Sequence, residues 1–190
     1  YYVNVAQLRL SKALYNSGYV SKADSLLSLL IKNKDTEAKI KAYALTDRAF
    51  IKIVDSITDY PLVISMYENV VNDYGAKYMT YKDYWVYSYA LERVGRQEES
   101  QYLVDKLSQL DSSVSAYYWR YRIEVDKGNI TEALSVLEKS VTMHNEEVTE
   151  SLRQSLASTQ REYYESQYRE ASLQVRVKNQ MIIIVVSFAV

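Results

Sequence analysis

The chain has 190 residues, of which 48% are apolar and 25% charged, with a formal net charge of −1. This composition is typical of a folded chain, and the absence of any basic block argues against nucleic-acid binding by this chain. With no cysteine and a single histidine, neither thiolate nor multi-histidine metal sites can form, nor can a cysteine–histidine catalytic pair. One proline and four glycines favour long helices joined by short turns.

The first half of the chain predicts two helical hairpins, 2–33 and 36–74. Apolar residues recur at helical spacing on both sides of Gly18, which marks the first turn. The second hairpin has a longer turn without glycine. In its second helix, Pro61 suits the first turn, where a missing N–H group has no cost.

Two further hairpins, 79–110 and 114–144, are predicted on the same plan. Their first helices end at Gly95 and Gly128, which are 33 residues apart. In each hairpin an apolar stripe follows the glycine at helical spacing. A supersecondary unit that recurs at this period is typical of a helical repeat protein.

The segment 145–180 contains neither glycine nor proline and has sparse apolar residues among Ser, Gln, Glu and Arg. It predicts one long, mostly solvated helix, whose first part caps the last hairpin with a polar end. The heptad pattern of a coiled coil is weak here because Gln and Ser occupy many seam positions. This helix is nevertheless a candidate contact for a homodimer.

The chain closes with the apolar run MIIIVVSFAV, residues 181–190. A membrane-spanning helix needs about 20 apolar residues, so this run is too short by itself. Because it follows a charged stretch, we expect it to be the beginning of a truncated transmembrane helix that anchors the chain to a membrane. A buried helix or strand is the alternative.

The four hairpins resemble tetratricopeptide repeats (TPRs), which place small residues and a turn glycine at fixed positions. The matching residues are Ser11, Gly18, Ala23 and Leu27 in the first repeat, Ser88, Gly95, Ser100 and Val104 in the third, and Gly128, Ala133 and Leu137 in the fourth. The second repeat fits only with an insertion, and the proline expected at each repeat end is missing. The resemblance implies an all-α fold, a right-handed superhelix of TPR-like hairpins followed by a long C-terminal helix.

A TPR array binds a protein or peptide along the first helices of its hairpins. Residues at the corresponding positions here supply aromatic rings for contact area and charges for register. The resemblance thus implies a partner-binding groove formed by Lys12, Tyr15, Tyr43, Asp47, Trp85, Tyr89, Glu92, Tyr118 and Arg122, with Phe50 beside Asp47. The alternative is that these rings pack between neighbouring hairpins.

A repeat domain followed by a long polar helix and a membrane span is similar to bacterial membrane-anchored regulators, either transcriptional regulators or histidine kinases. This similarity implies a sensory or scaffold domain in signal transduction, with the repeats on the extracytoplasmic, periplasmic side. Arg176 and Lys178 before the apolar run favour a cytoplasmic location instead. A soluble TPR scaffold or chaperone-like protein is the alternative function.

Catalysis finds little support in the sequence. His144 is the only histidine, and no glycine-rich phosphate loop or GxSxG motif is present. Adjacent carboxylates such as Glu98 and Glu99 point apart on a helix. We therefore expect no enzymatic activity, no cofactor and no metal.

Overall fold

The computed structural model describes residues 2–54 and 58–188, the side chains of residues 175 and 177–188 excepted. The elements are α1 (Tyr2–Asn16), α2 (Val20–Lys32), α3 (Ala38–Ile53), α4 (Tyr60–Asn69), the π-helix η1 (Val70–Tyr74), the 3₁₀-helix η2 (Ala76–Tyr78), α5 (Tyr81–Arg93), α6 (Gln97–Leu110), α7 (Val114–Asp126) and α8 (Ile130–Phe188). The described residues form no strand, so the all-α prediction is confirmed.

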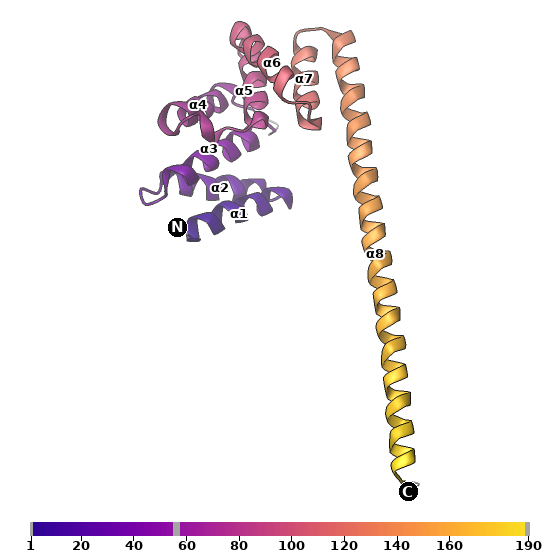
Figure 1. The fold of residues 1–190 in the computed structure, drawn as a ribbon. Coiled ribbons are helices and arrows are strands. Elements are labelled where there is room, and N and C mark those ends of the chain that lie inside the picture. Colours follow the sequence, from indigo (N-terminus) through magenta and orange to yellow (C-terminus); the bar gives the residue numbers. More distant parts are fainter. Residues whose placement is uncertain (1, 55–57, 189–190) are drawn as a thin grey trace. The chain divides into compact units, whose positions relative to one another are not determined.

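From α1 to α6, each helix packs against the helix that follows it along the chain (Figure 1). Helix α1 pairs with α2, α3 with α4, and α5 with α6. The first helices of neighbouring pairs also touch, because α1 contacts α3, α3 contacts α5 and α5 contacts α7. The odd-numbered helices α1, α3, α5 and α7 therefore form a continuous row.

The hydrophobic core has two parts. The smaller part joins α2 to α3 around Ala23, Leu27 and Ile40, with side chains of α1 packed against it. The larger part extends from α3 to α7 and includes the fully buried Tyr67 and Trp85. Small residues allow close helix crossings: Ala23 is 0% exposed, and the hydroxyl of Ser88 donates to the carbonyl of Ser100 at 3.1 Å across the α5–α6 pair.

Glycine and capping residues set the helix ends. Gly95 and Gly128 follow α5 and α7 with φ of 81° and 79°, a left-handed conformation that glycine adopts without steric cost. Helix α5 begins with a capping box, in which Thr80 accepts from the backbone of Asp83 while the Asp83 carboxylate accepts from the Thr80 backbone. The side chain of Asp59 caps α4 just before Pro61. Of the long second turn, residues 55–57 lie outside the described residues.

The chain divides into two compact units, 1–141 and 142–190. The first holds α1 to α7 and the beginning of α8, and the second consists of the remainder of α8. Helix α8 is one continuous helix of 59 residues.

The predicted membrane anchor is wrong, because none of the helices in the described part of the chain is both long and apolar enough to span a bilayer. In α8 the run that begins at Met181 continues a helix whose preceding turns carry Arg176 and Lys178. These charges interrupt the apolar length that a bilayer requires. The predicted membrane-anchored localisation is corrected accordingly; residues 189–190, the end of the predicted span, lie outside the described residues.

Candidate functional site

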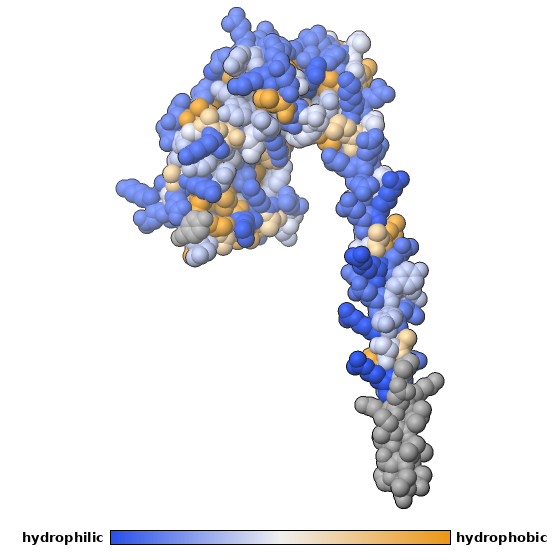
Figure 2. Space-filling model, viewed as in Figure 1, coloured by the Kyte–Doolittle hydropathy of each residue, from blue (hydrophilic) through white to orange (hydrophobic). Residues whose placement is uncertain are grey.

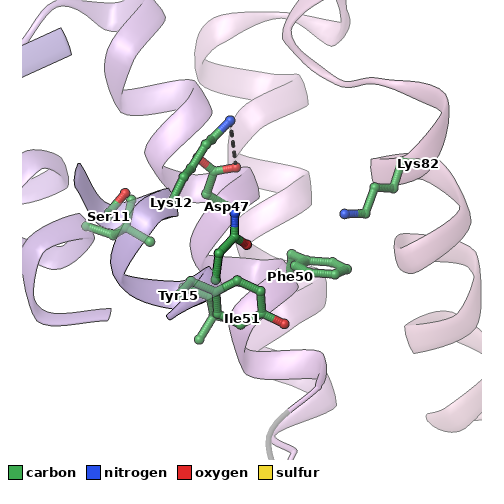
Figure 3. Close-up of a pocket in the computed structure, with 9 residues that line it drawn as sticks. Ser11, Lys12, Tyr15, Asp47, Phe50, Ile51 and Lys82 are labelled. Carbon is green, nitrogen blue, oxygen red and sulfur yellow. Dashed lines mark ion pairs between the residues drawn. The ribbon is translucent and has the colours of Figure 1, made fainter. Parts of the chain in front are cut away.

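The row of odd-numbered helices contains a pocket of about 180 Å³. Its lining comes from α1, α2, α3 and the first turn of α5, so it joins three successive hairpins. The lining residues are Ser11, Lys12, Tyr15, Asn16, Leu27, Asp47, Phe50, Ile51 and Lys82. Figure 3 shows Lys12 and Asp47 meeting between α1 and α3, with Lys82 directed toward them from a separate helix.

Asp47 is the most unusual group in this pocket. Its Oδ1 pairs with the Nζ of Lys12 at 3.4 Å (Figure 3). Its Oδ2 is buried and accepts no hydrogen bond from any residue that the structure describes. Burial raises the pKa of the Asp47 carboxyl, and the Lys12 ammonium offsets part of this effect. The site thus holds a carboxylate oxygen that lacks a donor.

Lys82 lies on the opposite side of the pocket. Its Nζ is 3.6 Å from the ring centroid of Phe50, a cation–π contact. Partial burial lowers the pKa of Lys82, while Asp83 and Asp47 oppose this shift. Phe50 also meets Tyr15 edge to face, at 5.9 Å between ring centroids. The pocket therefore combines two ammonium groups with aromatic surface and one carboxylate.

A second cluster lies between α5 and α7. Arg122 donates from Nη2 to the hydroxyl of Tyr89 at 2.7 Å and from Nη1 to that of Tyr118 at 3.1 Å. The ring of Tyr89 packs on Trp119 at 5.4 Å. Burial raises the pKa of Tyr89 to about 12, although Arg122 acts in the opposite direction. The polar groups of this cluster satisfy one another, so it needs no ligand.

The structure distributes the predicted groove residues between surface and core. Lys12, Tyr15 and Asp47 come together in the pocket, with Phe50 beside them. The ring of Tyr43 is half-buried against Tyr78, outside the pocket lining.

Three predicted groove residues of α5 are buried. Trp85 and Tyr89 are each 1% exposed, and Glu92 is 7% exposed. The indole N–H of Trp85 donates to Asp111 Oδ2 at 3.0 Å, which ties α5 to the loop before α7. Tyr118 and Arg122 remain accessible on α7. The alternative role for these rings, packing between neighbouring hairpins, thus applies most clearly to Trp85.

Sequence reasoning missed Lys82 and Asn16 as pocket residues. Lys82 lies two residues after the α5 N-cap Thr80, outside the positions that the TPR resemblance assigns to the groove. The sequence did contain a signal for Lys82, because the Thr80–Asp83 capping box fixes where α5 begins.

Comparisons of the chain with protein-family models, curated proteins and solved structures find no match.

Proposed function

We propose that this chain is a peptide-binding module, a right-handed superhelical stack of TPR-like hairpins that holds an extended peptide of a partner protein along α1, α3, α5 and α7. Three features of the fold support the TPR-like assignment. The first helices of successive hairpins contact one another. Each of the turn glycines Gly18, Gly95 and Gly128 has positive φ, and small residues occupy the tight helix crossings.

The observation that carries the binding proposal is the unpartnered Oδ2 of Asp47 in the pocket. A buried carboxylate oxygen without a donor is unfavourable, and a ligand N–H group would relieve that cost. The ammonium of Lys82 is on the other side of the pocket and can donate to a carbonyl oxygen. An extended peptide offers N–H donors and carbonyl acceptors together.

The aromatic surface of the pocket supplies the remaining requirement for peptide recognition. Tyr15 and Phe50 present ring area between the charged groups. Aromatic contacts typically contribute most of the affinity at such sites, while the charges fix orientation.

Phage display tests this function. The full chain serves as bait for a library of random 12-residue peptides. We expect enriched peptides that lose about 10-fold or more in affinity for the Phe50→Ala variant, because truncation removes the ring that lines the pocket between Tyr15 and Lys82. The matched control is Tyr102→Ala on α6, an aromatic residue that is 66% exposed and does not line this pocket. A library that yields no enriched peptide, or peptides that bind both variants equally, would contradict the proposal.

A further inference from the structure

The second unit of the chain is a single helix and so has no hydrophobic core of its own. Every described side chain from residue 144 to residue 174 is exposed. Within this stretch the ion pairs are Glu150 with Arg153 at 3.9 Å and Glu165 with Arg169 at 4.0 Å. Such exposed pairs add little, and most helical stability in proteins comes from packing of an apolar face. This helix therefore needs a surface to pack against.

One face of the helix is suited to that packing. Val148, Leu152, Leu156, Tyr163 and Leu173 fall within about 100° of one another at 100° per residue. They cover about 38 Å of helix axis at 1.5 Å per residue. In Figure 2, apolar side chains interrupt the otherwise hydrophilic surface of this helix. Each of the five is at least 45% exposed.

The spacing of this stripe explains why its heptad pattern is weak. The step from Leu152 to Leu156 is four residues where a heptad seam would continue with three. This insertion is a stutter, after which Thr159, Tyr163 and Ser166 continue the seam. The stripe is therefore continuous in space although the sequence repeat is broken.

We propose that the part of this stripe from Leu156 to Leu173 packs, antiparallel, against the same part of the stripe in a second copy of the chain, with the two-fold axis between Tyr164 and Glu165. In this register Leu156 faces Leu173 of the second copy, and the large ring of Tyr163 faces the small Ser166. Alternation of large and small residues across a helical seam gives close packing. Glu170, the only acidic residue among the seam positions from Val148 to Leu173, then faces Thr159.

Charge complementarity selects the antiparallel second copy over a parallel one. In the antiparallel register Glu162 lies beside Arg169 of the second copy, and the two-fold axis repeats this contact. Both side chains flank the stripe and are exposed. A parallel arrangement would place Glu170 against Glu170 and would pair Glu162 with Gln167. Like charges in contact are unfavourable, and complementary flanking charges set partner orientation.

Sedimentation equilibrium of the full chain tests the contact, and it does so independently of peptide binding. We expect a reversible dimer whose dissociation constant rises about 10-fold or more in Glu162→Arg, which juxtaposes two arginine pairs. The double variant Glu162→Arg with Arg169→Glu should recover most of this loss. Tyr168→Glu, a change on the opposite face at a position 79% exposed, is the control and should leave the dimer unchanged.

Cross-linking then reports the orientation, because the chain has no native cysteine. In the antiparallel dimer, a mixture of Leu156→Cys and Leu173→Cys chains should form a disulfide-linked dimer, whereas neither variant alone should. Cross-linking of either variant alone would show a parallel pair and overturn the antiparallel register. A wild-type chain that sediments as a monomer at about 100 μM would overturn the proposal itself.

Discussion

Trp85 shows that a residue on the predicted binding face can instead hold the fold together. Its ring is 1% exposed and its indole N–H donates to Asp111 at 3.0 Å. We expect Trp85→Ala to lower the free energy of unfolding by about 3–5 kcal/mol, because it leaves a cavity in the main core. Trp85→Phe should cost about 1–3 kcal/mol, since Asp111 loses a donor.

Urea unfolding followed by circular dichroism measures both variants. Tyr81→Phe, on the same helix at a position 51% exposed, serves as the control and should change stability by less than about 0.5 kcal/mol. Wild-type stability in Trp85→Ala, accompanied by loss of peptide binding, would instead place this ring in the binding site.

The carboxyl group of Asp47 makes the stability of the folded chain depend on pH. Burial raises the pKa of this carboxyl above its ordinary 3.8. Between pH 3.8 and the folded-state pKa, the folded chain therefore holds a proton that the unfolded chain has already released. The folded state therefore loses stability relative to the unfolded state as pH rises from 3.8 through the folded-state pKa. Above that pKa the cost of the buried charge stays constant.

Asp47→Asn removes this titration while keeping an oxygen acceptor for Lys12. Relative to wild type, the unfolding free energy of the variant should therefore increase as the pH rises from 3.8 through the folded-state pKa of Asp47. Urea unfolding at a series of pH values measures the difference. Parallel pH profiles for the two proteins would show that Asp47 has the same pKa in the folded and unfolded chains.

At the level of the helices, substitution of a turn glycine tests directly where the first helix of a hairpin ends. Gly95 has a φ of 81°, and an added Cβ would meet no atom within 4 Å. Any loss of stability on substitution would therefore come from the backbone conformation and not from a steric clash. Gly95→Ala should destabilise by about 1 kcal/mol, and the β-branched Gly95→Val by more.

Thermal melting and urea unfolding of these variants provide the measurement. The adjacent Val94→Ala, at a position 38% exposed, should differ from wild type by less than about 0.5 kcal/mol. If Gly95→Val were as stable as wild type, α5 would not end in the left-handed turn described above.

The helices were more predictable from sequence than the site, for a physical reason. Glycine turns and apolar periodicity act locally, so Gly18, Gly95 and Gly128 mark helix ends without knowledge of the fold. How deeply a side chain is buried within the stack depends instead on the neighbouring helices. The TPR resemblance placed Trp85 on the binding face of its helix, but the packing of α5 between α4, α6 and α7 buries its ring.

The pocket depends on contacts even more distant along the chain. Lys12 and Asp47 are 35 positions apart, and Lys82 a further 35, so no local pattern brings them together. The TPR resemblance supplied the first two by position, while Lys82 became visible only with α3 packed on α5. The apolar run 181–190 led to a wrong prediction for the opposite reason: local composition alone indicated a membrane anchor, whereas no helix in the described part of the chain is long and apolar enough to cross a bilayer.

At the level of the whole molecule, the proposed function requires a peptide to bind in the pocket on the odd-numbered helices. A titration of the ¹⁵N-labelled chain with a selected peptide, followed by amide NMR, tests this most directly. We expect saturable shifts centred on Lys12, Asp47, Phe50 and Lys82, with little change on the exposed face of α6. Shifts confined to α6 or to residues 144–174 of α8, with the pocket amides unchanged, would show that the peptide binds elsewhere.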